Sequence, residues 1–467
     1  MTRDRAYFFC GVGGSGMLPL ALILAARGAH VEGSDRALDQ GRTAAKFAYL
    51  RARGVALHPQ DGSGVRSADQ IVVASAAVEE SVPDIAAARR VGAVVMKRAD
   101  LLAELFNASL NAIAVGGTSG KSTTTAMIAW ILHRTGCDPT VVNGAVMKNF
   151  ADASQPFASA LVGEGPAFVA EVDESDGTIA LYRPRIAVLN NIALDHKSMD
   201  ELRALFGAFL ARAVIGIVNL DNAEAARLAD AAPRTVTFAI DHPDADYRAE
   251  AIEPLVDGIV FAAVERETGA RARVKLSTPG RHNVANALAA VAGAMALGIA
   301  PQEAAQKLAG FAGMRRRLEV AGSAAGVTVI DDFAHNPDKI AATLAALHDF
   351  PGRLLLMFQP SGYGPLVLTR DALIETFVSG MHDEDLLIMP PPLYYGGTTN
   401  RAVTSDDIIA GVAAGGRRAE ASPDRAACGA RLLAEAKPGD RIVIMGARDD
   451  TLSDFAAELV ASLGESP

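Results

Sequence analysis

The residues best suited to chemistry in this chain follow an apolar run at 112–115. Their order is Gly116-Gly117-Thr118-Ser119-Gly120-Lys121-Ser122-Thr123, and a helical pattern comes next. Glycines let several backbone N–H groups converge on phosphate oxygens, and the start of the helix adds a favourable field. In such a loop the Lys121 ammonium reaches the β- and γ-phosphates of a nucleotide, and the Ser122 hydroxyl binds Mg²⁺.

This loop departs from the general phosphate-binding pattern at one place. Val115 stands where that pattern has its first glycine. An ordinary connection from strand to helix would explain the glycines but not the sequence Gly-Lys-Ser-Thr. We therefore predict a nucleotide site at 116–125.

A second glycine-rich turn lies near the start of the chain. An apolar run at 6–10 leads into Gly11-Val12-Gly13-Gly14-Ser15-Gly16. Asp35 ends the next apolar run about 20 residues further on, where dinucleotide-binding folds place an acidic residue beside a ribose. The glycines alone would also fit a turn that only packs tightly. A ligand with a diphosphate is favoured, but a plain dehydrogenase is not, because hydride transfer has no use for the second phosphate loop.

Composition bounds the class of protein. Half of the residues are hydrophobic, as in globular proteins. A chain of 467 residues is too long for one hydrophobic core, so we expect roughly two to four domains. With 44 basic and 54 acidic residues the net charge is −10, which argues against nucleic acid as the main partner. An anionic substrate would therefore need a local basic pocket.

The cysteines and the apolar stretches indicate a compartment. Cys10, Cys137 and Cys428 lie far apart without a metal-binding spacing, which fits a reducing environment. The charged residues at 3–5 and a short apolar run do not form a signal peptide, and no apolar stretch reaches the length of a membrane span. We expect a cytoplasmic protein without a membrane partner, either a monomer or a homodimer.

Short apolar runs alternate with alanine- and leucine-rich helical patterns along most of the chain, which is typical of parallel α/β domains. We expect three domains, at 1–107, 108–318 and 319–467. The predicted strands are 6–10, 30–33, 71–74, 112–115, 166–170, 186–189, 215–218, 327–330, 354–358, 386–389 and 442–445. The segment 235–277 looks more antiparallel, and a long helix spans about 283–297.

Further polar motifs follow in series. They are Glu171-Val172-Asp173-Glu174-Ser175-Asp176, Asn190-Asn191-Ile192-Ala193-Leu194-Asp195-His196, Pro279-Gly280-Arg281-His282-Asn283-Val284-Ala285-Asn286, Arg315-Arg316-Arg317-Leu318-Glu319 and Asp331-Asp332-Phe333-Ala334-His335-Asn336-Pro337. Each has an ordinary reading, such as a solvated acidic loop, a surface run of arginines or a turn capped by His335. Their occurrence together weakens those readings.

Together with the two glycine loops, this series resembles the Mur ligases, the ATP-dependent amide-forming enzymes of peptidoglycan synthesis. Within that family it is most similar to the alanine-adding branch and to the recycling branch that attaches a tripeptide. The resemblance covers nearly the whole chain and keeps the order of the motifs. It implies an α/β protein with a Rossmann-like UDP-binding domain, a central P-loop ATPase-type domain and a C-terminal Rossmann-like domain.

The resemblance also implies roles for individual residues. The UDP-sugar would lie at Gly11, Gly13, Gly14, Ser15, Gly16 and Asp35. ATP would lie at Gly117, Thr118, Ser119, Gly120, Lys121, Ser122, Thr123, Asn283, Asn286, Arg317 and Asp332. Magnesium would be held by Ser122, Glu171 and His196. The catalytic group would be Lys121, Glu171, His196, Arg317 and His335.

The implied reaction suits these residue types. ATP would convert a carboxylate of a UDP-N-acetylmuramate-type substrate into an acyl phosphate, which the amine of an amino acid or short peptide then attacks. Mg²⁺ and Lys121 would offset the negative charge that gathers during this step. Oxygen ligands such as Ser122 and Glu171 suit a hard cation.

The sequence departs from the alanine-adding pattern where that pattern carries two arginines for the incoming amino acid. Gly362 and Pro365 occupy those places, and neither can bind a carboxylate as arginine does. Either the acceptor is not L-alanine, or Arg370, Arg401 or Arg448 replaces the lost contact. No lysine occurs at 202–213, where several Mur ligases carry a carbamylated one, and this favours the alanine-adding branch.

Three alternatives stay open. The first is a recycling ligase that attaches a preformed tripeptide to UDP-N-acetylmuramate. The second is a P-loop kinase or transporter-type ATPase, and the third is a non-catalytic protein that binds sugar nucleotides.

Overall fold

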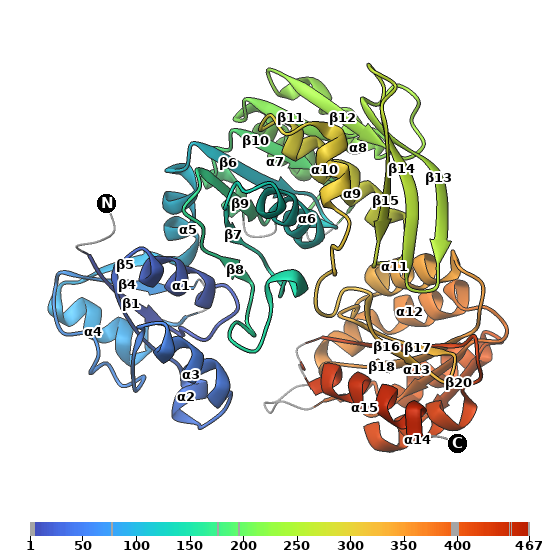
Figure 1. The fold of residues 1–467 in the computed structure, drawn as a ribbon. Helices are drawn as coiled ribbons and strands as arrows, with labels where there is room; N and C mark the ends of the chain where they lie inside the picture. The colour runs from blue at the N-terminus through green and yellow to red at the C-terminus, as the bar shows by residue number, and fades with distance from the viewer. Residues whose placement is uncertain are drawn as a thin grey trace. The chain divides into compact units, whose positions relative to one another are not determined.

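The computed structural model describes residues 5–75, 78–174, 177–194, 197–393, 401–447, 449 and 451–465. Three sheets follow one another along the chain (Figure 1). The chain forms two compact units, one of Met1–Glu250, Ala262–Val274 and Val284–Phe311, and the other of Ala251–Phe261, Lys275–Asn283 and Ala312–Pro467. Within the described residues, none of the helices has both the length and the apolar character needed to cross a membrane.

Five parallel strands make the first sheet, in the order β3-β2-β1-β4-β5. The order reverses between β1 and β4, and in such sheets ligands bind at the carboxyl ends of the strands at this point. The first glycine loop follows β1 and therefore lies there. The elements are β1 (Ala6–Cys10), α1 (Leu18–Ala26), β2 (His30–Ser34), α2 (Arg36–Asp39), α3 (Ala44–Ala52), β3 (Ala56–His58), β4 (Gln70–Ala74), α4 (Pro83–Val91), β5 (Val94–Lys97) and α5 (Arg98–Asn107).

The second sheet has ten strands, in the order β15-β14-β13-β12-β11-β10-β6-β9-β7-β8. Strand β6, in the interior of this sheet, pairs in parallel with β9 and β10, so the carboxyl ends of all three meet at one edge. The first elements are β6 (Asn111–Gly116), α6 (Lys121–Arg134), β7 (Thr140–Val142), β8 (Ala160–Leu161), β9 (Ala167–Glu171), β10 (Ile186–Leu189), α7 (Met199–Ala211), β11 (Ile215–Asn219) and α8 (Ala223–Ala226). The later ones are β12 (Thr235–Ala239), β13 (Tyr247–Leu255), β14 (Gly258–Glu265), β15 (Arg271–Leu276), α9 (Arg281–Met295) and α10 (Pro301–Lys307).

The segment 235–277 is only partly antiparallel. Strand β12 pairs in parallel with β11, and β13 pairs in parallel with β12, so the expectation was wrong for the first part of the segment. Strands β13 and β14 are neighbours joined by two residues, which only an antiparallel pair allows. Alternating side chains such as those of 271–276 reveal a strand with one exposed face, but they do not reveal its direction.

The third sheet has the order β16-β17-β21-β18-β19-β20, and apolar clusters cover both of its faces. Only the β16–β17 pair is antiparallel among the pairings described for it. The elements are β16 (Glu319–Ala324), β17 (Val327–Asp332), α11 (Pro337–His348), β18 (Leu354–Gln359), α12 (Tyr363–Gly380), β19 (Leu386–Met389), α13 (Ser405–Ala414), β20 (Arg418–Ala421), α14 (Arg425–Glu435), β21 (Arg441–Gly446) and α15 (Thr451–Glu465).

The α/β fold and the predicted strands are confirmed, with strand ends that differ from the expected ones by at most two residues. Most of their sequences are apolar at nearly every position because strands of parallel sheets are covered on both faces, although β2 contains Glu32 and β17 contains Thr328. The long helix α9 begins and ends two residues earlier than expected.

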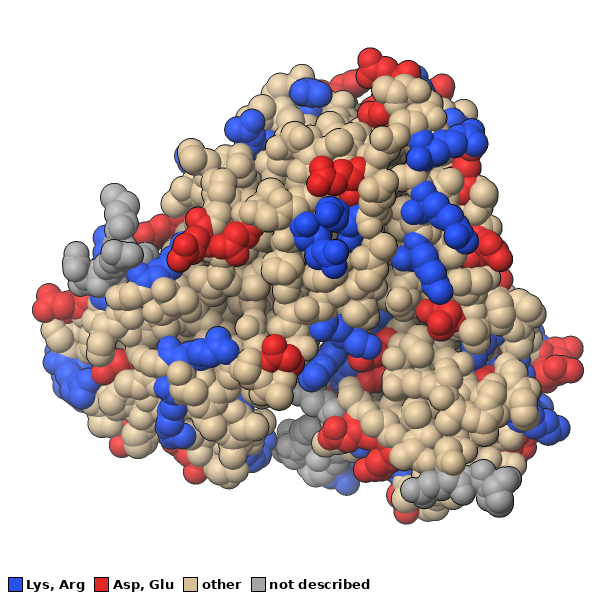
Figure 2. All heavy atoms as spheres, viewed as in Figure 1, with Lys and Arg blue, Asp and Glu red and all other residues tan. Residues whose placement is uncertain are grey.

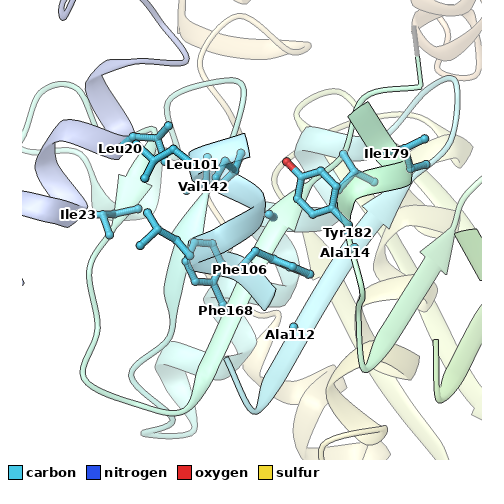
Figure 3. Close-up of a cluster of buried hydrophobic side chains, with 14 of the residues drawn as sticks. Leu20, Ile23, Leu101, Phe106, Ala112, Ala114, Val142, Phe168, Ile179 and Tyr182 are labelled. Atoms are coloured by element: carbon cyan, nitrogen blue, oxygen red, sulfur yellow. The ribbon is translucent and has the colours of Figure 1, made fainter. Parts of the chain in front are cut away.

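The first two sheets share one hydrophobic cluster (Figure 3). The Phe106 ring on α5 lies 5.6 Å from the ring of Phe168 on β9 and 5.2 Å from the ring of Tyr182, in edge-to-face geometry. Helix α1 adds Leu20 and Ile23, and its residues 18–24 are all buried. An all-apolar helix of this kind must be covered on every side, so α1 serves both sheets.

Phe106→Ala should lower the free energy of unfolding by about 3 to 5 kcal/mol, because it removes a fully buried aromatic ring from this cluster. Urea denaturation of the full chain measures the change. The matched control is Val94→Ala on the exposed face of β5, where the side chain is 59% exposed and a change within about 0.5 kcal/mol is expected. Equal effects of the two substitutions would show that the cluster is not a shared core.

Candidate active site

Residues 117–120 connect the buried strand β6 to helix α6. We call this segment, with Lys121 and Ser122 at the start of α6, the phosphate-type loop, because its sequence is that of a phosphate-binding loop. Gly117 and Gly120 have φ angles of +131° and +78°, which side chains disfavour. A Cβ at Gly120 would also lie 2.5 Å from Asn286 Oδ1 and 2.9 Å from Asn190 Nδ2. Glycine is therefore needed both for the backbone conformation and for the close approach of two side chains.

Asn191, just after β10, fixes the position of this loop. Its Oδ1 accepts hydrogen bonds from Thr118 Oγ1 and Ser119 N, both at 2.9 Å, and its Nδ2 donates to Ser119 Oγ at 2.9 Å. The loop is thus held by the end of the neighbouring strand. Asn191 is not among the predicted site residues, because its place beside the loop depends on the pairing of β6 with β10.

Two carboxylates from the segment after β9 hold the reactive side chains of the loop. Lys121 Nζ donates to Gly117 O at 2.7 Å and forms an ion pair with Glu174 Oε2 at 2.8 Å. Ser122 Oγ donates to Glu171 Oε2 at 2.6 Å. The Glu174 side chain is buried, so its charge depends on the Lys121 ammonium. Both glutamates belong to one acidic run of the sequence, but only Glu171 is among the predicted site residues.

The arrangement of the loop, Lys121, Ser122 and Glu171 fits a nucleoside triphosphate with a divalent cation. The loop offers backbone N–H groups and an ammonium group for phosphate. The hydroxyl of Ser122 and the carboxylate of Glu171 are already adjacent, and hard cations prefer oxygen ligands of these two kinds. His196, the third predicted ligand, lies outside the described residues, and its role stays a prediction.

The two asparagines of α9 have different partners. Asn286 Oδ1 accepts a hydrogen bond from Thr124 Oγ1 at 3.1 Å, which places Asn286 beside the phosphate-type loop. Asn283 Nδ2 donates to Pro279 O at 2.7 Å and so steadies the start of the helix. The contact of either residue with an adenine ring stays a prediction.

The glycine loop after β1 is held in the same manner as the loop after β6. Asp35 Oδ2 accepts from Gly13 N, and its Oδ1 accepts from Ala37 N at the start of α2, both at 2.8 Å. The carboxylate therefore organises the loop and caps a helix. Its predicted place near a uridine stays a prediction.

Two basic side chains that the sequence analysis missed approach this first loop. Lys46 Nζ on α3 donates to Gly13 O at 3.3 Å. A Cβ at Gly16 would lie 3.0 Å from Arg98 Nη1, so the guanidinium on α5 lies directly against the loop. Over the face shown in Figure 2, basic and acidic side chains are interspersed. Positive charge at this loop therefore comes from individual residues and not from a general field.

In the second unit, the three consecutive arginines 315–317 differ in burial: Arg315 is exposed, Arg316 is buried and Arg317 is half-buried. Arg316 is buried and donates to Gly446 O at 2.6 Å and to Asp449 O at 2.9 Å, with Asp331 Oδ1 3.3 Å from its Nε. It therefore joins β17 to the end of β21. Reading the run as a solvated surface is wrong for this residue, which the pattern of three like charges could not reveal.

The other predicted residues of this unit lie near one another. The Arg317 guanidinium lies 5.3 Å from the centre of the Phe333 ring. Asp332 is buried and accepts hydrogen bonds from Ala334 N and Thr343 Oγ1. His335 Nδ1 is 2.9 Å from Phe333 O. Asn336 caps α11, which is the role that the sequence analysis considered for His335.

The surroundings of Gly362 distinguish the candidate replacement arginines. Gly362 has a φ of +120° and immediately precedes α12. The Arg401 guanidinium lies 5.5 Å from the centre of the Tyr363 ring, at the first residue of that helix. Arg370 forms an ion pair with its neighbour Asp371, and Arg448 lies outside the described residues.

Comparisons with known proteins match most of the chain to one family. Family models described as "Mur ligase family, catalytic domain", "Mur ligase middle domain" and "Mur ligase, glutamate ligase domain" match residues 6–109, 115–294 and 316–448. A UDP-N-acetylmuramate–L-alanine ligase of Symbiobacterium thermophilum is 34% identical over 96% of this chain and 93% of its own length. The enzyme of that name from Anaeromyxobacter dehalogenans strain 2CP-1 is 36% identical over 99% and 98%.

Solved structures show the same fold. The UDP-N-acetylmuramate–alanine ligase of Thermotoga maritima superposes with a TM-score of 0.76 at 23% identity, covering 98% of both chains. A murein peptide ligase of Psychrobacter arcticus 273-4 gives a TM-score of 0.68 at 26% identity, covering 99% of this chain and 100% of its own.

Lys121→Ala should reduce nucleotide turnover by at least about 100-fold, because it removes the ammonium that offsets phosphate charge. Binding of a uridine nucleotide at the first glycine loop should be unchanged, as calorimetric titration can measure. The double variant Lys121→Ala/Glu174→Gln is the control, since it also removes the carboxylate left without its partner. This double variant should regain thermal stability without regaining turnover. If Lys121→Ala loses uridine nucleotide binding as well as turnover, the two loops are not independent sites.

Asp332→Asn should not lower stability at pH 7.5. Burial raises the pKa of Asp332, while its Thr343 hydrogen bond and the charge of Arg317 lower it by less. A folded-state pKa above the unfolded value of about 3.9 means that the native protein loses stability as the pH rises between the two. The asparagine variant lacks this loss, so its advantage in urea denaturation should shrink from pH 7.5 to pH 5. If the stability of Asp332→Asn relative to the wild type instead increases toward low pH, the pKa of Asp332 is not raised in the folded protein.

Proposed function

This chain belongs to the Mur ligase family, and we propose that it joins the carboxylate of UDP-N-acetylmuramate to the amine of an amino acid. Like the family, it is an ATP-dependent ligase of peptidoglycan synthesis. The observation that supports the proposal best is the pairing of Lys121 with Glu174 and of Ser122 with Glu171 at the ends of adjacent strands.

The phosphate-type loop would hold ATP, which supplies the phosphoryl group that turns the carboxylate into an acyl phosphate. Lys121 then offsets charge on the transferred group, and Ser122 with Glu171 holds Mg²⁺. Because Asn191 fixes the loop beforehand, these groups need little rearrangement when phosphate binds. His196 is proposed as a further ligand of magnesium.

The first glycine loop would hold the diphosphate of the UDP-sugar. Gly13 and Gly16 let the loop backbone lie close to Asp35 and Arg98, and Lys46 with Arg98 supplies positive charge at the loop. The domain at 1–107 would then bind the sugar nucleotide, and the domain at 108–318 would bind ATP. Arg317, at the end of the domain at 108–318, is proposed to contact the nucleotide and the reacting groups together with Asp332 and His335 of the domain at 319–467.

L-Alanine is the proposed acceptor, in keeping with the names of the relatives. Arg401 beside Tyr363 is proposed to bind its carboxylate, in place of the arginines replaced by Gly362 and Pro365. A tripeptide is the second candidate acceptor, which those same small replacements favour because they leave more room. We propose that the enzyme acts in the cytoplasm, as a monomer or homodimer.

Phosphate release from ATP tests this function. With UDP-N-acetylmuramate, Mg²⁺ and L-alanine, the full chain should release phosphate on the order of once per second or faster. Glycine, L-serine and the tripeptide L-alanyl-γ-D-glutamyl-meso-diaminopimelate serve as the other acceptors, and Lys121→Ala is the inactive control. If phosphate is released only with the tripeptide, the acceptor is the tripeptide and not L-alanine. If no acceptor gives phosphate release, the proposed ligase activity is wrong.

A further inference from the structure

Asn143 lies beside the proposed cation site although it belongs to none of the predicted motifs. It follows β7, which pairs in parallel with β9 so that Val142 is opposite Ala170. Asn143 and Glu171, the residues that follow this pair, therefore lie next to each other at the carboxyl ends of the two strands. The Asn143 residue is only 2% exposed, and its Nδ2 donates to Ser122 O at 3.0 Å.

The carbonyl oxygen of the Asn143 side chain has no hydrogen-bond partner among the described residues, although it is fully buried. Buried polar atoms in native proteins are nearly always paired with protein or ordered water, so an exception requires an explanation. The hydrogen bond to Ser122 O fixes the orientation of the amide, because the reverse orientation would set two carbonyl oxygens against each other. The oxygen Oδ1 therefore needs a donor that the described residues do not supply.

Gly144 shows how closely Glu171 approaches the same segment. A Cβ at Gly144 would overlap Glu171 Oε1, so the carboxylate lies directly against the backbone next to Asn143. Asn143 Oδ1, the Glu171 carboxylate and the Ser122 hydroxyl thus come from adjoining residues of one small region. A cluster of oxygens is the environment that a hydrated magnesium ion prefers, because Mg²⁺ keeps several of its waters.

We propose that Asn143 is a positioning residue of the cation site, whose Oδ1 accepts a hydrogen bond from a water molecule bound to the divalent cation. The proposal rests on the proposed function, since it takes Ser122 and Glu171 to hold that cation together with ATP. Outer partners of this kind fix the bound water and the ligands around a metal. Gly144 leaves the space in which the Glu171 carboxylate stays close enough to take part.

Binding of Mn²⁺ in place of Mg²⁺ tests the proposal without turnover. Electron paramagnetic resonance counts bound Mn²⁺ in the full chain with a non-hydrolysable ATP analogue. Asn143→Ala should weaken Mn²⁺ binding about tenfold, the loss typical of an outer partner of a metal site. Asn143→Asp loses the donor to Ser122 O but keeps an acceptor oxygen and adds negative charge, so it should bind Mn²⁺ more tightly than Asn143→Ala does.

Asn219→Ala is the matched control. Asn219 is also buried at a strand end of the same sheet, and its Nδ2 also donates to a backbone carbonyl of the site, that of Asn190, at 2.9 Å. Its Oδ1, however, accepts from Asp221 N, so it has no atom in need of a donor. Thermal unfolding is followed for all the variants, and Mn²⁺ affinity in Asn219→Ala should stay near that of the wild type.

Three outcomes would overturn the proposal. If Asn143→Asp weakens Mn²⁺ binding as much as Asn143→Ala does, the residue acts only through its hydrogen bond to Ser122. If Asn143→Ala binds Mn²⁺ as the wild type does, Asn143 has no part in the site while the proposed function stands. If the wild type itself binds no Mn²⁺ with the nucleotide analogue, the proposed cation site fails together with this inference.

Discussion

The ion pair between Lys121 and Glu174 is the constraint on which the rest of the site depends. A carboxylate that is almost fully buried is tolerated only with its charge balanced, so Glu174 and Lys121 require each other. This pair forms only if β9 lies beside β6, and the loop keeps its shape only if β10 lies on the other side. The order of three interior strands of a ten-stranded sheet therefore sets the electrostatics of the phosphate-type loop.

The two glycine loops are stabilised by the same device with a different charge. In each, a side chain from the end of a neighbouring strand accepts a backbone N–H of the loop, and that side chain is Asp35 in the first and Asn191 in the second. A neutral amide suits the second loop, where Glu171 and Glu174 already concentrate negative charge. A carboxylate is acceptable in the first, where Lys46 and Arg98 are close by.

The features that sequence could predict are local ones. Apolar runs indicate buried strands, and glycines followed by Gly-Lys-Ser indicate a phosphate-type loop. Strand β6 and its loop can therefore be predicted from the sequence. Arg98, Asn143 and Glu174 were missed because their importance comes from strand order and helix packing across many residues. Arg316 was missed for the opposite reason, since a run of like charges resembles a surface even when one member is buried.

The cluster around Phe106 limits how this protein can be taken apart. The first sheet is a separate segment of sequence, yet its helix α1 and the side chain of Phe106 have their packing partners on the second sheet. A chimera that exchanged residues 1–107 with those of a relative would join two half-cores shaped for different partners. Inheritance of this segment is therefore coupled to that of the segment after it, and recombination between relatives is expected to succeed only where both halves of the cluster travel together.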